Sequence, residues 1–384
     1  MPYVRAPKMK VAIEGIIGHM IHRPNNAFPF FRNFIYHLPS RGDVTYYLFL
    51  DTPTTEALSQ FLKREDFRVI DTGRTASKLG RLYRMHVILP LLLRKYGIGV
   101  YCSIVTNEIP FFGDFKKIVR ISSLAVHHYP SMFNVATTAY RKALDPTIVH
   151  KADLVIANSY SMRNDILHHF KVANDNIIMI PEPIDPFWLE DIADDRREKV
   201  LGISDPYILF VSGLTRYKNP HTLLNAFWHL KRSGSYPHKL VFVGHGDFES
   251  ELRQMVQHYE LEKEALFAGF VDKDTLRKLY RAANMVVHPS FYEATGNVCL
   301  QSMAMGVPLI ASNILSIPEL TGDAALLFDP HSAEELENHL RDLINNESSR
   351  QTLIERGLRR IELFRDWQEP MDQFLSAVTR VVER

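Results

Sequence analysis

Short apolar runs alternate with longer segments of helical period along the whole chain, and this alternation limits the folds that the chain can adopt. Strands that alternate with helices are typical of parallel sheets, because a parallel neighbour is reached only through a crossover connection. The sequence therefore predicts an α/β protein with parallel sheets. The expected strands are 10–14, 44–50, 67–71, 99–105, 118–126, 154–158, 177–180, 207–212, 239–244, 266–270, 285–289 and 308–312. The expected helices are 55–64, 77–96, 161–169, 221–232, 248–258, 275–283, 297–305, 333–345 and 349–383.

A break in this pattern divides the chain into two halves. Pro181, Pro183 and Pro186 lie close together, and a run of charged residues follows at 194–199. Proline clusters and charge runs are typical of linkers. A chain of 384 residues is also longer than one ordinary core supports. We therefore expect one domain at 1–185 and a second at 186–360.

Composition excludes several classes of protein. Apolar residues make up 46% and charged residues 23%, and 45 basic side chains balance 44 acidic ones to a net charge of +1. A nucleic-acid-binding protein usually shows a basic excess, so no nucleic-acid partner is expected. The sequence shows no signal peptide and no run of about 20 apolar residues. Cys102 and Cys299 are far apart, which favours two buried thiols in a cytoplasmic protein over a zinc site or a disulfide.

The first candidate site follows the strand at 207–212. Gly213 leads into an extended turn that carries Arg216 and Lys218, and Pro220 suits the first turn of a helix. Ligands of open α/β sheets bind where a strand ends and a helix begins. Arginine and lysine side chains there bind phosphate oxygens well. The alternative is a pair of ordinary surface cations on a loop, and the spacing alone does not decide between the two.

The second candidate site precedes the helix expected at 297–305. Glu293 is placed to accept hydrogen bonds from sugar hydroxyls, and the amides of 296–298 open the helix, where its dipole favours oxygen-rich groups. The alternative is that Glu293 and Thr295 only cap this helix. The residues of this stretch that we single out are Glu293, Thr295, Gly296, Asn297, Val298 and Gln301.

Together the two stretches resemble the retaining glycosyltransferases of family 4, which have the GT-B fold of two Rossmann-like domains facing a cleft. The resemblance is carried by VSGLTRYKNPHTLLNAF, LVFVGHGDFESEL, LFAGFVDKDTLRKLYRAANMVVHPSFYEATGNVCLQSMAMGVPLIAS and NILSIPELTGDAALLFDP, in this order. It is strong over about 208–330. It is weaker in the first half, where LAVHHYP, ADLVIANSYS and NIIMIPEPIDP carry it.

The resemblance implies roles for residues of the second half. Arg216 and Lys218 are expected to bind the diphosphate of a nucleotide-sugar donor, and Glu293 and the amides after it to hold the transferred sugar. The strand end Gly269-Phe270-Val271 is expected to line the nucleobase. A second glutamate of the family, which binds the ribose hydroxyls, falls on Gln301. Because an amide nitrogen cannot accept a hydrogen bond, we hypothesise weaker ribose binding or a deoxyribose donor.

In the first half the resemblance points to a glycine-containing loop and to a histidine. Gly15 and Gly18 match the loop that approaches the donor phosphate, although a tight turn explains two glycines equally well. His127 matches the family's histidine near the sugar, while His128 stands where the family has an acid. A buried histidine with an ordinary structural role is the alternative for His127.

The family also suggests the reaction. We expect transfer of a hexose, with retention of configuration, to a glycan or lipid-linked acceptor in bacterial surface polysaccharide synthesis such as that of lipopolysaccharide. No cofactor and no metal are expected, since the D-x-D at 272–274 directly precedes a helix and suits a cap better than a metal. The alternatives are a non-catalytic nucleotide-sugar-binding regulator and a sugar-nucleotide epimerase of the same architecture.

Two further expectations concern the surroundings of the site. The C-terminal segment 361–384 is expected to form a helix that crosses back to the first domain, as in the family. Mixed basic and apolar residues at 28–34 and 81–95 suggest peripheral contact with the inner face of the cell membrane or with a lipid-linked acceptor. Core helices with basic ends explain the second of these clusters as well.

Overall fold

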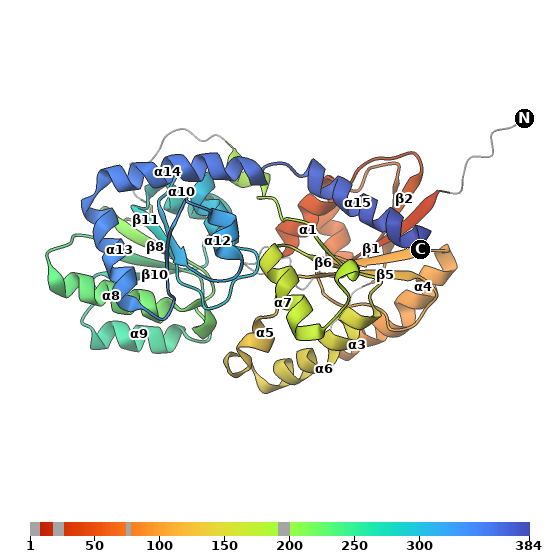
Figure 1. Cartoon of the computed structure of the whole chain (residues 1–384), viewed down its shortest axis with the longest axis horizontal. Helices are drawn as coiled ribbons and strands as arrows, with labels where there is room; N and C mark the ends of the chain where they lie inside the picture. The colour runs from red at the N-terminus through yellow and green to blue at the C-terminus, as the bar shows by residue number, and fades with distance from the viewer. Residues whose placement is uncertain (1–7, 18–26, 74–77, 191–199) are drawn as a thin grey trace, which may run out of the picture. The chain divides into compact units, whose positions relative to one another are not determined.

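The computed structural model describes residues 8–17, 27–73, 78–190 and 200–384, which form two compact units (Figure 1). Unit 1 contains 1–183 together with 366–384, and unit 2 contains 184–365. The division falls at 183/184 and 365/366, where the sequence placed it at 185/186 and 360/361. The C-terminal helix thus belongs to the first unit.

Unit 1 is built on a parallel sheet of seven strands in the order β3-β2-β1-β4-β5-β6-β7. Its strands are β1 (Met9–Gly15), β2 (Val44–Leu50), β3 (Phe67–Asp71), β4 (Val100–Ser103), β5 (Lys116–Ile121), β6 (Leu154–Ala157) and β7 (Ile177–Met179). Its helices are α1 (Ala27–Tyr36), α2 (Thr52–Leu58), α3 (Lys78–Tyr83), α4 (Leu89–Tyr96), α5 (Ala125–His128), α6 (Val135–Lys151), α7 (Tyr160–Phe170) and α15 (Gln368–Glu383).

The core of unit 1 includes residues from both ends of the chain. Val11 and Ile13 of β1 pack in the same buried cluster as Phe374 and Val378 of α15. The ring of Phe34 on α1 meets that of Phe374 edge to face, with centroids 5.1 Å apart. The last helix is thereby an integral part of this core, since aromatic pairs of this kind add to the free energy of burial.

Unit 2 is built on a parallel sheet of six strands in the order β10-β9-β8-β11-β12-β13. Its strands are β8 (Tyr207–Val211), β9 (Lys239–Val243), β10 (Ala265–Gly269), β11 (Met285–His288), β12 (Leu309–Ser312) and β13 (Leu326–Phe328). Its helices are α8 (Pro220–Ser233), α9 (Glu249–His258), α10 (Lys273–Ala282), α11 (Asn297–Ala304), α12 (Ser316–Thr321), α13 (Ala333–Asn345) and α14 (Glu347–Ile361).

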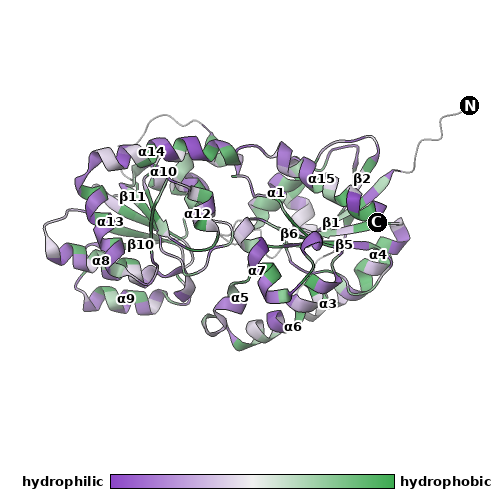
Figure 2. Ribbon diagram, in the orientation of Figure 1, coloured by the Kyte–Doolittle hydropathy of each residue, from purple (hydrophilic) through white to green (hydrophobic). Residues whose placement is uncertain are grey.

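Both faces of the second sheet are buried. Ile208 and Phe210 of β8 point into a cluster formed with α8, α9 and α13, while Tyr207 and Leu209 point into another formed with α10, α11 and α12. Successive side chains of a strand point to opposite faces, so an apolar strand supplies two cores at once. The strands are accordingly green in Figure 2, whereas the surrounding helices carry purple residues.

These two sheets confirm the α/β fold class, with differences in particular elements. The expected strand 118–126 ends at Ile121, and its last residues begin α5. The expected helix 77–96 is interrupted by a π-helical turn at Arg84–Ile88, and the expected helix 349–383 is two helices separated by a 3-10 turn at Glu362–Phe364. Among the described residues, no helix is both long and apolar enough to cross a membrane.

Each sheet has one point at which strand order reverses. In unit 1 the reversal lies between β1 and β4, and in unit 2 between β8 and β11. Loops at the carboxyl ends of such neighbouring strands diverge and leave a crevice that binds ligands in open α/β sheets. Functional side chains are therefore expected on the loops that follow these four strands.

Candidate functional site

The loop after β8 is anchored by Asn219. This residue adopts a left-handed conformation with φ of 59°, and its buried side-chain amide donates to the carbonyl oxygens of Pro289 at 2.9 Å and Pro330 at 2.8 Å. The two bonds hold the loop against the ends of β11 and β13. The 3-10 turn Arg216–Lys218 directly precedes Asn219, so the backbone that carries these two cationic side chains is held in place as well.

Lys218 and Glu293 form an ion pair between the loops that follow β8 and β11. Lys218 Nζ donates to Glu293 Oε2 at 2.7 Å, and only 16% and 10% of the two side chains are exposed. His288 Nε2 lies 2.8 Å from the same oxygen, and the Gly296 amide donates to Oε1 at 3.2 Å. Two residues 75 positions apart in sequence thus meet at the reversal point of the second sheet.

The pair stays charged despite its burial. Burial alone would raise the pKa of Glu293, but the charge of Lys218 and the hydrogen bond from His288 hold it well below its ordinary value. Burial likewise acts to lower the pKa of Lys218, and Glu293 outweighs this and raises it. Buried charges persist only when they are paired and hydrogen-bonded in this way. Glu293 is therefore a fixed acceptor rather than a proton donor.

Arg216 lies apart from this pair. Its side chain is 55% exposed, forms an ion pair with Glu251 of α9 and lies over the ring of Phe248 at 4.8 Å. Arg216 and Lys218 therefore have different partners, although they are neighbours in one turn. An exposed ion pair contributes only about 0–1 kcal/mol, so Arg216 can leave Glu251 for a stronger anion at little cost.

Helix α11 begins directly beside Glu293. Gly296 is its N-cap residue with φ of 62°, and the amides of Asn297 and Val298 are the first of the helix. The Gly296 amide donates to Glu293 just before the helix begins, but among the described residues no side chain caps the first turn of α11, so the alternative role of Glu293 and Thr295 as helix caps is wrong. Thr295 is partly buried beside them.

Gln301 lies inside unit 2 on the same helix. Its side chain is buried, and its Oε1 accepts a hydrogen bond from the Tyr280 hydroxyl at 2.9 Å. The single side-chain oxygen of this residue is thus engaged by α10. A glutamate at this position would have a second oxygen for another donor.

The end of β9 approaches the loop after β8 very closely. The backbone carbonyl of His245 accepts from the Leu214 amide at 3.0 Å. A Cβ atom on Gly244, whose φ is 129°, would lie 2.0 Å from the carbonyl oxygen of Ser212. Only glycine allows two backbones to meet at this distance. Gly213, by contrast, leaves room for a side chain, since its nearest neighbour would be 3.6 Å away.

The strand end Gly269-Phe270-Val271 lies beside the same region. Phe270 is 52% exposed, and its ring contacts His245 with centroids 4.9 Å apart. The Gly269 carbonyl accepts from the Gly244 amide at 2.8 Å. An exposed aromatic ring next to main-chain groups suits a planar ligand.

In unit 1, His127 is held by an acid. Its Nε2 lies 2.8 Å from Oδ2 of Asp145, and Arg141 pairs with the other oxygen of that carboxylate, Oδ1, at 3.0 Å. Only 10% of the His127 side chain is exposed. Gly15 ends β1, and a Cβ there would lie 2.2 Å from Phe31, so it allows α1 to pack on the strand. Gly18 lies outside the described residues.

A pocket in unit 1 joins Arg81 and Arg84, from the basic and apolar cluster at 81–95, to acidic residues that the sequence analysis did not single out. Glu14 is fully buried at the end of β1, where Oε1 accepts from the Ile16 amide at 2.7 Å and Oε2 from the Thr106 hydroxyl at 2.8 Å. Burial raises the pKa of Glu14 to about 7. Glu108, Arg81 and Arg84 also line this pocket. It follows β1 and β4, the reversal point of the first sheet.

Comparison with known proteins shows what the second unit is similar to. Residues 191–360 match the family model of glycosyl transferases group 1. The chain is 32% identical over 172 residues to O-antigen chain mannosyltransferase B of Escherichia coli. The aligned segment covers 44% of this chain and 45% of that relative, so the chain matches less than half of the relative's length. Unit 2 therefore resembles the group 1 glycosyltransferases, and the match spans less than half of the chain.

The fold of the whole chain is that of solved glycosyltransferases. Sucrose-phosphate synthase from Thermosynechococcus elongatus aligns with a TM-score of 0.75 at 21% identity, covering 97% of this chain and 99% of that one. Anabaena HepE in complex with UDP and glucose also gives a TM-score of 0.75 at 19% identity, covering 97% and 100%. At these identities the likeness shows the fold, which confirms two Rossmann-like domains.

In unit 2, the D-x-D at 272–274 is a helix cap, as expected. Asp272 is the N-cap residue of α10 and accepts from the Thr275 amide at 2.8 Å and the Thr275 hydroxyl at 2.6 Å. The sequence analysis missed His288 and Tyr280, which fix Glu293 and Gln301. His288 ends β11, and Tyr280 lies inside α10. Contacts between residues of separate elements do not produce a regular spacing in the sequence, so they could not be predicted from it.

Proposed function

We propose that the chain transfers a hexose from a nucleoside-diphosphate sugar to a glycan or lipid-linked acceptor, with retention of configuration. The observation that carries the proposal is the Lys218–Glu293 pair at the reversal point of β8 and β11, in the unit that resembles the group 1 glycosyltransferases. HepE, a structural neighbour, binds UDP and glucose, which supports a nucleotide-sugar donor. The O-antigen mannosyltransferase relative supports a role in surface polysaccharide synthesis, with mannose as the first sugar to test.

Two cations are proposed to bind the diphosphate. Lys218 is fixed by Glu293, whereas Arg216 is held by an exposed ion pair and by the ring of Phe248, and can turn to the donor. The first amides of α11, those of Asn297 and Val298, add the positive end of a helix dipole. These groups stabilise the negative charge that develops on the leaving diphosphate. We accordingly propose that the reaction needs no metal ion and no cofactor.

Glu293 is proposed to orient the transferred sugar. A carboxylate offers about four lone-pair sites, and Lys218, His288 and the Gly296 amide fill three of them. One site remains for a sugar hydroxyl. The ion pair holds Glu293 in place, which suits an acceptor of hydrogen bonds better than a covalent nucleophile.

The proposed step proceeds on one face of the sugar. The bond between the anomeric carbon and the diphosphate oxygen breaks, and a bond from that carbon to the acceptor oxygen forms on the same face. The acceptor proton passes to the departing diphosphate oxygen. His127, which Asp145 orients, is proposed to contact the sugar, and the Glu14 pocket is proposed to receive acceptor hydroxyls.

A donor panel tests the proposal. Release of nucleoside diphosphate is measured with UDP-, GDP- and dTDP-linked hexoses, with and without a glycan acceptor, and the sugar nucleotides are analysed afterwards. We expect one donor to be cleaved faster when acceptor is present. Binding without cleavage would instead support a regulator, and conversion of the donor to its epimer without acceptor would support an epimerase.

Gln301 makes the panel informative about the nucleotide. UDP-glucose and 2′-deoxy-UDP-glucose differ in one hydroxyl only. Because Tyr280 engages the Gln301 oxygen, we expect calorimetry to find no loss of affinity for the deoxy donor, and a gain for the ribose donor in Gln301→Glu. Tighter binding of the ribose donor by the unaltered protein would contradict the deoxyribose hypothesis.

A further inference from the structure

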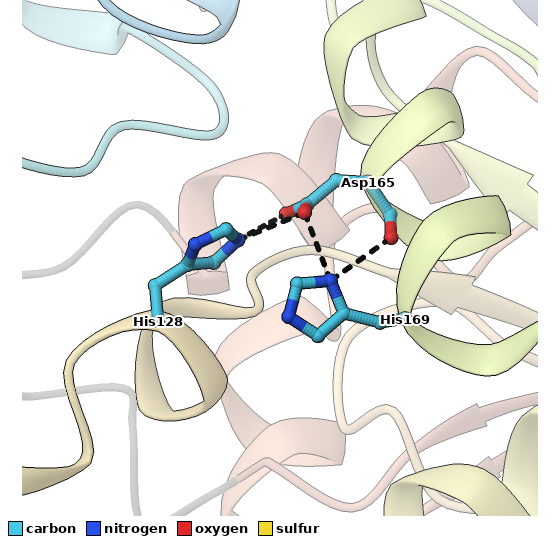
Figure 3. Close-up of side chains that lie close together, drawn as sticks. All are labelled: His128, Asp165 and His169. Atoms are coloured by element: carbon cyan, nitrogen blue, oxygen red, sulfur yellow. Dashed lines mark hydrogen bonds and ion pairs between the residues drawn. The ribbon is translucent and has the colours of Figure 1, made fainter.

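A cluster of two histidines and one aspartate lies in unit 1, separate from the residues proposed for the donor. Figure 3 shows that His128 of α5 points toward Asp165 and His169 of α7. His128 Nε2 lies 2.8 Å from Oδ1 and 2.9 Å from Oδ2 of Asp165, and His169 Nδ1 lies 3.1 Å from Oδ1. One ligand atom of each residue lies within 4.8 Å of the other two.

The helix itself explains two members of the cluster. Asp165 and His169 are four residues apart on α7, so their side chains lie on one face of the helix. The helix starts at the N-cap residue Ser159, whose hydroxyl accepts from the Met162 amide at 3.0 Å. This cap fixes the residue at which α7 begins, and so which of its residues share the face of Asp165 and His169. The third residue of the cluster, His128, lies on α5.

Burial and exposure in the cluster suit an ion that enters from water. The Asp165 side chain is only 8% exposed, whereas those of His128 and His169 are 30% and 24% exposed. A buried carboxylate is stable when it is paired with a cation or coordinates a metal. The partly exposed imidazoles leave a route to the carboxylate from solvent.

We propose that His128, Asp165 and His169 form a binding site for a divalent transition-metal ion, with water as a further ligand. Two imidazoles and one carboxylate are a donor set that binds Zn²⁺ and other first-row ions. Tetrahedral zinc with bonds of about 2.0–2.1 Å holds its ligand atoms about 3.3 Å apart. The two histidine-to-aspartate spacings of 2.8 and 3.1 Å need to open by a few tenths of an ångström, and the two imidazole nitrogens lie within 4.8 Å of each other, a distance that rotation of the partly exposed rings can adjust. Each imidazole binds as a neutral group through the ring nitrogen that carries no proton, and its other ring nitrogen carries the N–H.

The bound ion has a positioning role. It ties α5 to α7 through side chains, and α5 also carries His127. No step of the sugar transfer passes through the ion. The metal site and the metal-independent donor chemistry are therefore separate claims, and either can fail without the other.

Zinc titration of the intact chain tests the site. The chain is stripped with a chelator, and Zn²⁺ affinity is measured by competition with a chromophoric chelator for the unaltered protein, His128→Gln, His169→Gln and His168→Gln. His168 is exposed, lies on the same helix and supplies no atom to the cluster. We expect one tight equivalent in the unaltered protein and in His168→Gln, and a loss of at least about tenfold in the other two variants.

Thermal melting and X-ray absorption complete the test. Zn²⁺ should raise the Tm of the unaltered protein and of His168→Gln only, because an ion that binds the native form stabilises it. X-ray absorption of the zinc-loaded protein should show nitrogen and oxygen ligands and no sulfur. Equal affinity in all four proteins, or a sulfur ligand, would overturn the proposal even if one variant did not fold.

Discussion

Glu14 is the titratable residue whose environment has the clearest consequence for stability. It is fully buried, and only the Ile16 amide and the Thr106 hydroxyl donate to it. Burial raises its pKa from 4.5 to about 7. A carboxyl group with a raised pKa stabilises the folded state fully below the unfolded value of 4.5, and this contribution is lost as pH rises toward 7. The loss amounts to about 3 kcal/mol.

The variant Glu14→Gln does not titrate, so it should lack this loss. Measured by urea unfolding, the midpoint of Glu14→Gln relative to the unaltered protein should rise between pH 5 and pH 8. The pH 5 comparison is the internal control, since Glu14 is then largely protonated. An equal difference at both pH values would show that Glu14 ionises as freely as an exposed glutamate.

Individual residues also show which parts of the candidate site could be predicted from the sequence. Arg216, Lys218 and Glu293 stand out because charged residues beside strand ends form a pattern that sequence retains. The Tyr280 bond to Gln301 joins residues 21 positions apart, and the Thr106 bond to Glu14 joins residues 92 apart. Such contacts depend on the packing of separate elements, which one sequence does not encode as a spacing.

Among the elements, the strands at 44–50 and 67–71 were predicted to the residue, because apolar runs with clear borders define them. The strand at 118–126 was overextended. An apolar run resumes at Leu124 after two serines, but the Ser123 hydroxyl accepts from the Ala125 amide at 3.2 Å and α5 begins there. The three-residue strand β13 was missed, since so short a run carries no periodicity. The π turn before Pro90 reflects the amide that proline lacks.

The close approach of β9 to the loop after β8 yields a prediction at this scale. Gly244→Ala should destabilise unit 2 by about 2–3 kcal/mol, because its Cβ would lie 2.0 Å from the Ser212 carbonyl at a φ that disfavours side chains. Gly213→Ala, with 3.6 Å to its nearest neighbour, is the matched control. Urea unfolding of both variants measures the difference. Equal stability of the two would mean that the loops separate without cost.

For the whole molecule, both units follow one rule. Each parallel sheet reverses its strand order once, and each has ionisable side chains of low exposure beside that reversal, Glu14 at the end of β1 in unit 1 and the Lys218–Glu293 pair after β8 and β11 in unit 2. The alternation of strands and helices predicted parallel sheets, and the break near 181–199 together with the chain length predicted that there are two domains. These side chains gain defined partners only when the chain has folded. The sequence alone therefore left two roles open for Glu293, ligand binding and helix capping.

The turnover of Arg216→Ala tests the central claim most directly. Arg232 provides the control, since it is also exposed and lies over an aromatic ring, that of Trp228 at 4.9 Å. With the donor that the panel selects, at saturation, Arg216→Ala should lower kcat by about 100-fold or more while its Tm stays unchanged. Arg232→Ala should keep full activity. Near-normal turnover in Arg216→Ala would contradict the claim that this arginine neutralises the leaving diphosphate.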